Sequence, residues 1–297
     1  MKRETVISAS NPKIKNLLLL QEKAKARKEQ GLFVVEGLRE LQHCLEGGFK
    51  VRAIFFCPEI LDASAAEGIV SPIASASLRP LPSAMGLSLL SGRGWPEIFD
   101  TIPSAAETLV IDIPEQLYRK VAYRDSTEGI IAEVEYKALT LSDLQLPENP
   151  LIMVLESVEK PGNLGAVLRS ADAAGASAVF ICDPLTDLYN PNLIRASIGA
   201  VFTVPVVAVS SEDAIAFLQE RGIQILTAQL QDSSLYYDVE MKRGTALVMG
   251  TESIGLTDRW REAAISHIRI PMLGRLDSLN VSVSAAILLF EAVRQRQ

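Results

Sequence analysis

The residues best suited to chemistry lie in three short segments, each of which follows an apolar run that we predict to be a strand. The first segment contains Asn163, Gly165 and Arg169. A glycine permits a tight turn or a close approach of the backbone, and Arg169 carries a permanent positive charge. Taken alone, this pattern is also typical of a helix that Asn163 caps and that displays a surface cation. It lacks the full glycine pattern of a dinucleotide-binding loop, which argues against a Rossmann-type enzyme.

The second segment follows the predicted strand 245–250 and contains Gly250, Thr251, Glu252 and Gly255. Loops at the carboxyl ends of strands are where α/β proteins bind their ligands. Glycines and free backbone amides in such a loop can hold an adenine or a ribose. The alternative is a plain turn between a strand and a helix, in which Glu252 is only solvated.

The third segment joins a predicted strand to the last predicted helix. Ser278 or Asn280 can be the N-cap of this helix, but a cap explains one polar residue and not the whole run. The helix alternates small and apolar residues, which is typical of a helix packed in a core or at a subunit interface. The segment spans 270–283 and contains Ile270, Met272, Ser278, Leu279 and Asn280.

Apolar runs and amphipathic segments alternate along the chain, and this order predicts an α/β fold with parallel sheets and helical crossovers. We predict strands over 32–36, 51–57, 110–113, 129–135, 151–156, 178–182, 204–209, 223–228, 245–250 and 267–271. We predict helices over 11–30, 37–46, 115–121, 163–174, 190–199, 212–221, 258–264 and 280–294.

The length of 297 residues suggests two domains. The polar, proline-bounded stretch 141–150 is the predicted linker between them. We therefore expect one domain over 1–140 and another over 151–297.

Charge is distributed unevenly along a chain whose net charge is −7. Residues 1–30 contain eight Lys or Arg and three Glu, a net +5, so the remaining residues carry −12. A basic segment can bind phosphates, although a solvated helix face is the simpler explanation of this feature alone. The cations near the end of the first predicted helix are Lys23, Lys25, Arg27 and Lys28.

The composition excludes several classes of protein. Three widely spaced cysteines and two histidines make neither a disulfide framework nor a metal site, so we expect free thiols and no bound metal. The apolar runs are shorter than a membrane-spanning helix requires, and the first residues lack the apolar stretch of a secretory leader. We expect a cytoplasmic protein with no membrane partner.

The three segments, in this order, resemble the motifs of the SpoU (TrmH-type) branch of the SPOUT RNA methyltransferases. The resemblance covers 151–297, and a weaker one relates the N-terminal part to the substrate-binding domain that precedes this catalytic domain. Ser253 departs from the pattern, because the family often has glycine there. The matching residues are Asn163, Gly165 and Arg169, then Gly250, Glu252 and Gly255, and finally Ile270, Pro271, Met272, Ser278, Leu279, Asn280 and Val281.

The resemblance implies an enzyme that transfers a methyl group from S-adenosylmethionine to a ribose 2′-hydroxyl of RNA, with ribosomal RNA as the preferred substrate. It implies a trefoil-knotted SPOUT domain with a parallel sheet, preceded by a smaller α/β domain that binds the RNA substrate. It also implies a homodimer with the knot helices at its interface.

The resemblance also assigns roles to individual residues. Arg169 corresponds to the catalytic arginine, with Asn163, Glu252, Ser278 and Asn280 orienting it and the ribose. Because the substrate is then RNA, the four cations Lys23, Lys25, Arg27 and Lys28 become candidates for phosphate contacts. The implied cofactor contacts are Gly250, Thr251, Ile270, Met272 and Leu279.

Two other functions stay open. One is a tRNA ribose 2′-O-methyltransferase, and the other is a catalytically silent RNA-binding or ribosome-assembly protein on the same scaffold. The polar residues retained in the three motifs favour an enzyme over a silent protein. Binding of S-adenosylmethionine distinguishes these two classes, because a silent protein need not bind the cofactor.

Overall fold

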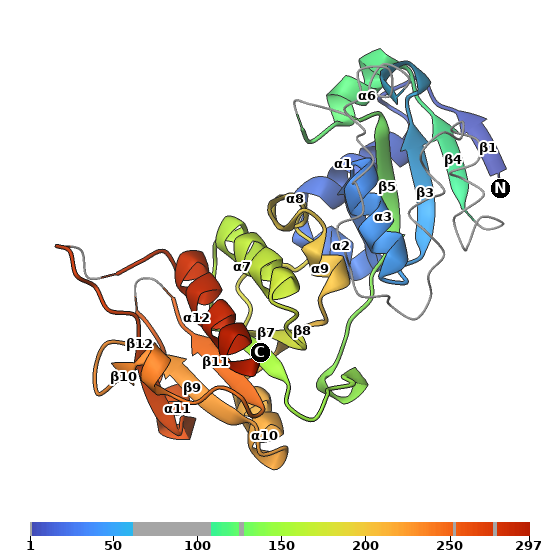
Figure 1. Ribbon diagram of the computed structural model, residues 1–297. Coiled ribbons are helices and arrows are strands. Elements are labelled where there is room, and N and C mark those ends of the chain that lie inside the picture. The colour runs from blue at the N-terminus through green and yellow to red at the C-terminus, as the bar shows by residue number, and fades with distance from the viewer. Residues whose placement is uncertain (1, 62–107, 125–127, 252–253, 276–277) are drawn as a thin grey trace. The chain divides into compact units, whose positions relative to one another are not determined.

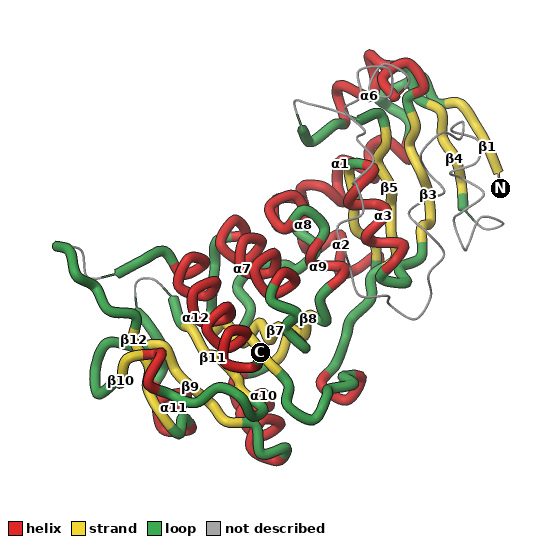
Figure 2. Tube along the Cα trace, viewed as in Figure 1, coloured by secondary structure: helices red, strands yellow, loops and turns green. Residues whose placement is uncertain are grey.

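The structure is a computed structural model that describes residues 2–61, 108–124, 128–251, 254–275 and 278–297. The chain divides into two compact units, Met1–Tyr136 and Lys137–Gln297, each with its own sheet (Figures 1 and 2). Among the described residues, no helix is long and apolar enough to cross a lipid bilayer.

The first unit contains a five-stranded sheet and helices that accompany it. The strand order is β1 (Lys2–Thr5), β4 (Leu109–Asp112), β3 (Val51–Phe56), β5 (Ile130–Glu135) and β2 (Leu32–Glu36). The helices described in this unit are α1 (Pro12–Glu22), α2 (Ala24–Gln30), α3 (Leu38–Glu46) and α6 (Glu115–Val121). β5 runs antiparallel to both of its neighbours, so this sheet is mixed, whereas the alternation of elements predicts a parallel one. Alternation along the chain does not determine strand direction, which depends on how the strands pair.

The core of the first unit forms where α1 packs on the sheet. Ile14, Leu17 and Leu20 lie three residues apart on one side of the helix and are fully buried. They belong to the same apolar cluster as Phe55 of β3 and Ile131 of β5. Burial of this side of α1 explains why the segment folds as a helix, because tertiary packing rather than propensity supplies most of a helix's stability.

The single helix predicted over 11–30 is two helices, with Lys23 in an extended conformation between them (φ −112°, ψ 108°). The guanidinium of Arg27 donates to the carbonyl oxygens of Leu20 at 2.6 Å and Gln21 at 3.1 Å. Arg27 is only 2% exposed. The expectation that Arg27 contacts RNA is therefore wrong: its charge is used to satisfy the end of α1, where helical carbonyls lack helical partners.

The second unit is built on a seven-stranded sheet in which every neighbouring pair is parallel. The strand order is β10 (Ser234–Leu235), β12 (Ser266–Arg269), β9 (Gln224–Ala228), β11 (Thr245–Met249), β6 (Leu151–Glu156), β7 (Ala178–Cys182) and β8 (Val206–Val209). The helices are α7 (Pro161–Ala173), α8 (Pro191–Ser197), α9 (Ala200–Thr203), α10 (Ser211–Glu220), α11 (Asp258–Ala263) and α12 (Val281–Arg296), with 3-10 turns at Leu141–Asp143 and Tyr236–Asp238. The predicted α/β class with a parallel sheet is confirmed.

Helices cover both faces of this sheet. In Figure 1, α7 and α12 lie side by side on one face, and α10 and α11 lie on the other. Every residue of β6 is buried, as its continuous apolar run predicts for a strand covered on two sides. Leucines of the segment 141–150, predicted as a linker, pack against the core of this unit together with Leu139.

The helix predicted over 190–199 ends at Ser197. Ile198 and Gly199 both have left-handed backbone conformations, with φ of 54° and 84°, and the chain resumes as α9 at Ala200. A β-branched residue rarely adopts a positive φ, so packing around Ile198 must hold it there.

Candidate active site

The three motif segments follow β6, β11 and β12, respectively. All strands of this sheet run in the same direction, so their carboxyl ends lie along one edge. Segments that are far apart in the sequence therefore come to the side of the sheet where parallel α/β folds bind ligands.

Two of the predicted polar residues meet at this edge. α7 begins at Pro161 after Lys160, so Asn163 lies inside the first turn and is not the N-cap. Asn280 is the N-cap of α12, where its Oδ1 accepts from the backbone N–H of Ser282 at 2.9 Å. The Nδ2 of Asn280 donates to Oδ1 of Asn163 at 3.2 Å, which joins the first and third segments across 117 positions of sequence.

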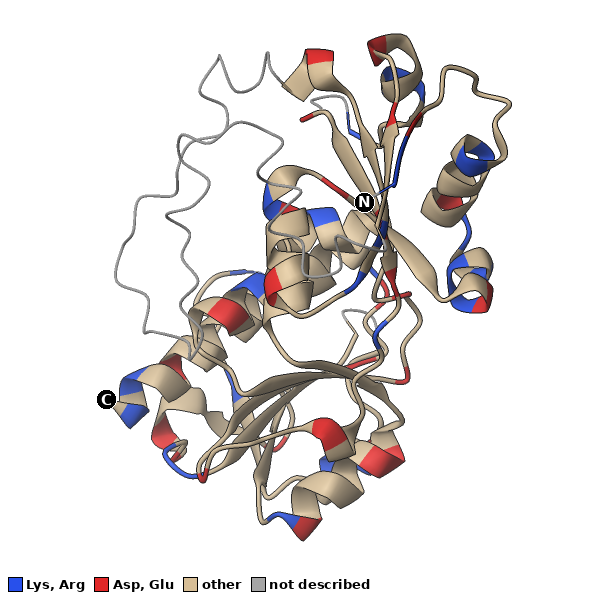
Figure 3. Cartoon of the chain, turned by 90° about the vertical axis from the view of Figure 1, so that its right-hand side faces the viewer, with Lys and Arg blue, Asp and Glu red and all other residues tan. Residues whose placement is uncertain are grey.

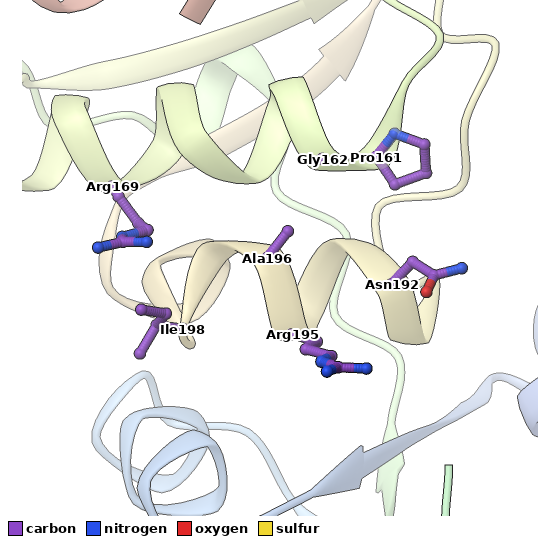
Figure 4. Close-up of a pocket in the computed structure, with 7 residues that line it drawn as sticks. All are labelled: Pro161, Gly162, Arg169, Asn192, Arg195, Ala196 and Ile198. Atoms are coloured by element: carbon purple, nitrogen blue, oxygen red, sulfur yellow. The ribbon is translucent and has the colours of Figure 1, made fainter. Parts of the chain in front are cut away.

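Arg169 lies on the exposed side of α7, beside α8. A Cβ added at Gly165 would lie 2.5 Å from the Cβ of Ala196, so only glycine at this position allows the two helices to approach so closely. Arg169 lies one turn further along α7, at the edge of an open pocket of about 520 Å³ (Figure 4). The other residues that line this pocket are Pro161, Gly162, Asn192, Arg195, Ala196 and Ile198.

The loop after β11 closes on itself. The backbone of Thr251 both donates to and accepts from the backbone of Gly255, at 3.2 and 3.1 Å. A Cβ at Gly250 would lie 2.2 Å from the carbonyl oxygen of Gly255, so glycine is required where the loop folds back. Glu252, predicted to orient the reacting groups, lies outside the described residues.

A buried carboxylate fastens this loop to the neighbouring strand. Glu156, the last residue of β6, is 3% exposed and accepts from the backbone N–H of Thr257 at 2.9 Å and from its hydroxyl at 2.7 Å. Glu156 is not among the residues predicted from the sequence. The available signal is that a carboxylate ends an otherwise apolar strand, where burial requires such a group to be hydrogen-bonded.

The remaining predicted residues lie between β12 and α12. Ile270 and Met272 are half-buried, and Ser278 and Leu279 are exposed immediately before α12. Among the described residues, this edge thus brings the apolar side chains of Ile270, Met272 and Leu279 to the same side of the sheet as the glycine-containing loop after β11. Apolar side chains beside a glycine-containing loop can accommodate a nucleoside. Among the described residues, no cluster of His, Cys, Asp or Glu could hold a metal ion.

The candidate RNA-binding cations lie in the first unit. Lys23, Lys25 and Lys28 are exposed, unlike Arg27, and Lys25 lies 3.7 Å from Glu29 one turn away. Figure 3 shows that Lys and Arg occur on many separate elements, often next to Asp or Glu. Positive charge is therefore not confined to one helix.

Comparison with known proteins gives consistent matches over both units. The profile of the SpoU rRNA Methylase family matches residues 150–290, and that of the MRM3-like substrate binding domain matches residues 11–79. Among curated proteins, the 23S rRNA (guanosine-2′-O-)-methyltransferase RlmB of Ralstonia nicotianae is 36% identical over 197 residues, which is 65% of this chain and 79% of that protein. The protein of the same name from Salmonella typhi is 42% identical over 176 residues, 57% of this chain and 72% of that protein.

Solved structures match almost the whole chain. The AdoMet-bound rRNA methyltransferase from Sinorhizobium meliloti has a TM-score of 0.78 and 28% identity, with 98% of each chain covered. An RNA 2′-O ribose methyltransferase has a TM-score of 0.75 and 33% identity, with 99% of each covered. The SpoU methyltransferase AviRb from Streptomyces viridochromogenes, in complex with AdoMet, has a TM-score of 0.76 and 25% identity, with 96% of this chain and 99% of that one covered.

Proposed function

The chain belongs to the SpoU rRNA methylase family and is an RNA ribose 2′-O-methyltransferase, and we propose that its methyl donor is S-adenosylmethionine and its substrate a guanosine of 23S rRNA. The observation that carries this proposal is the convergence of the motif segments at one edge of the second sheet, where Asn163 and Asn280 meet. The names of the curated relatives support the choice of RNA and of base.

The cofactor proposal rests on the fit of the loops after β11 and β12. Gly250 and Thr251 belong to a loop that the Thr251–Gly255 backbone pair closes, and Ile270, Met272 and Leu279 add apolar surface. These residues would hold the nucleoside and the methionine of S-adenosylmethionine. When bound, this cofactor supplies an electrophilic methyl group on a positively charged sulfur.

Arg169 is the residue that we assign to the reaction itself. A ribose hydroxyl is a weak nucleophile until its proton is polarised or removed. A guanidinium stays protonated at neutral pH and is a poor base, so Arg169 acts by stabilising negative charge on the ribose oxygen or on an adjacent phosphate. Asn163, Ser278 and Asn280 orient this arrangement, and Glu252 has the same assigned role.

The first unit is proposed to hold the RNA substrate. The match to a substrate-binding domain over 11–79 supports this assignment. Lys23, Lys25 and Lys28 are exposed and available for phosphate contacts, so their joint replacement by Ala should weaken RNA binding uniformly and lower its salt dependence.

The second unit is proposed to form a homodimer through α12 and to contain the trefoil knot that the resemblance implies. Leu279, Val283 and Phe290 are 40%, 47% and 48% exposed, and Val283 and Phe290 lie two turns apart on one side of the helix. An isologous contact that covers such a stripe is the commonest form of oligomer. Sedimentation of a 32.3 kDa species alone at micromolar concentration would contradict the dimer.

We place the enzyme in the cytoplasm, where bacterial ribosomal RNA is made. All three cysteines, Cys44, Cys57 and Cys182, are buried free thiols, which suits a reducing compartment.

The test is transfer of a labelled methyl group from S-adenosylmethionine to an unmodified 23S rRNA transcript, followed by mapping of the 2′-O-methyl position. Wild-type chain should methylate one guanosine, and Arg169→Ala should bind both ligands yet react roughly 10²–10³-fold more slowly. Methylation of tRNA instead would change the substrate assignment. Absence of cofactor binding by calorimetry would point to a silent RNA-binding protein.

A further inference from the structure

The pocket beside Arg169 contains a second arginine, which belongs to none of the three motif segments. Arg195 lies in α8 and lines the same pocket of about 520 Å³, together with the amide side chain of Asn192 (Figure 4). Figure 4 shows Arg169 reaching from α7 towards α8, and Arg195 projecting from α8 on the side away from α7. Two cationic side chains from two helices thus border one open space.

The charge of this pocket is unbalanced. Of the described residues that line it, two carry guanidinium groups and none carries a carboxylate. Within the part of the chain that the structure describes, neither Arg169 nor Arg195 pairs through its side chain. Exposed arginines elsewhere in this unit do pair, as Arg259 does with Glu212 at 2.9 Å. An anion in this pocket would be attracted by both positive charges.

The backbone at the rim of the pocket is also open. A Cβ added at Gly162 would have no atom within 4 Å, in contrast to Gly165, which packing requires. Gly162 is therefore not needed for contact with α8, and the space beside it in the first turn of α7 is open. That turn is the positive end of a 13-residue helix, which adds to the attraction for an anion.

We propose that Arg195, with Asn192, binds a phosphate of the RNA backbone next to the ribose on which Arg169 acts. The proposal rests on the proposed function, because it takes the anion to be part of the RNA substrate. A planar guanidinium can donate two parallel hydrogen bonds to a phosphate, which a lysine cannot do. Arg195 does not touch the reacting atoms in this scheme, so it is a positioning residue.

The experiment compares full-length wild-type chain with Arg195→Gln, Arg195→Lys and a control, Lys242→Gln. Lys242 is exposed in the same unit and outside the pocket, so its substitution removes the same charge elsewhere. Binding of the 23S rRNA transcript is measured across a salt series, and kcat and KM are measured with S-adenosylmethionine in excess. Calorimetry with the cofactor checks that each variant is folded.

Arg195→Gln should raise the KM for RNA roughly ten-fold while kcat at saturating RNA changes less than about two-fold. Its plot of log affinity against log salt should be shallower by about 0.7–0.9, the value for one lost phosphate contact. Arg195→Lys should keep the slope and recover part of the affinity, and Lys242→Gln should match wild type.

Wild-type KM and salt slope in Arg195→Gln would overturn the proposal, as would a fall in kcat with an unchanged slope. The proposed function fails separately, if wild-type chain binds the transcript but does not methylate it. In that case the salt slopes of the variants still decide whether Arg195 contacts phosphate.

Discussion

Arg27 offers a test that separates a cation used in folding from cations available to RNA. Arg27→Ala removes a guanidinium that is 2% exposed and that donates to the carbonyl oxygens of Leu20 at 2.6 Å and Gln21 at 3.1 Å. Both carbonyls lie in the last turn of α1, where the helix ends. We expect the variant to lose stability in the first unit.

The size of the effect follows from these two hydrogen bonds. Leaving a buried polar group without its hydrogen-bond partner costs about 1–3 kcal/mol of stability. Hydrogen bonds that involve a charged group, such as a guanidinium, contribute more than those between neutral groups. Two carbonyl groups lose their partner in Arg27→Ala, and water that reaches one of them would reduce the combined cost. We therefore expect the free energy of unfolding to fall by about 2–4 kcal/mol. Lys28→Ala removes the neighbouring, exposed charge and should change it by less than about 0.5 kcal/mol.

Urea denaturation of the full chain, followed by far-ultraviolet circular dichroism, measures this difference. Arg27→Ala should lower the midpoint of the transition of the first unit without changing its slope, because the surface exposed on unfolding is the same. Arg27→Lys should recover only part of the loss, since an ammonium lacks the fixed fork of donors. A wild-type midpoint combined with weakened RNA binding would refute the argument and return Arg27 to the RNA-binding set.

Three further changes test other parts of the structure. Burial raises the pKa of Glu133 to about 7, above its ordinary value of 4.5, so the stabilising contribution of its protonated form is complete below pH 4.5 and is lost as the pH rises through 7. We therefore compare the free energy of unfolding of Glu133→Gln with that of wild type by urea denaturation at pH 5 and at pH 8. Relative to wild type, the variant should be more stable at pH 8 than at pH 5 by on the order of 3 kcal/mol. The same difference between variant and wild type at both pH values would contradict this. Gly165→Ala places a methyl group 2.5 Å from the Cβ of Ala196 in α8, so thermal unfolding should show a loss of about 1–3 kcal/mol in the free energy of unfolding. The control Gly162→Ala adds a methyl group that has no atom within 4 Å and should not show this loss. Asn280→Ala removes a helix cap and the contact to Asn163, so it should lower the free energy of unfolding by about 0.5–2 kcal/mol and also lower the rate of methylation. Asn280→Ser restores the cap but not the contact, so it should recover stability alone. Recovery of methylation in Asn280→Ser would argue against a role for the contact.

The sequence by itself determined the class of fold and most of its elements. The predicted strand 32–36 and helix 115–121 coincide with β2 and α6, because the spacing of apolar residues acts within a few positions of the chain. The motifs that indicate a SpoU methyltransferase are also local strings of residues, and the family profile confirms them. Conformational preferences of this kind depend on a residue and its immediate neighbours, so they can be found without coordinates.

Only the tertiary structure decided which residues meet and which charges are free. Arg27 and Lys28 are adjacent cations in the sequence, yet the first is buried against carbonyls of α1 and the second is exposed. Asn163 forms no N-cap but contacts Asn280, and Arg195 joins Arg169 at one pocket. These partners depend on the strand order and on how closely helices pack. Such long-range relations arise from the burial of the whole core and leave no periodic trace in the chain.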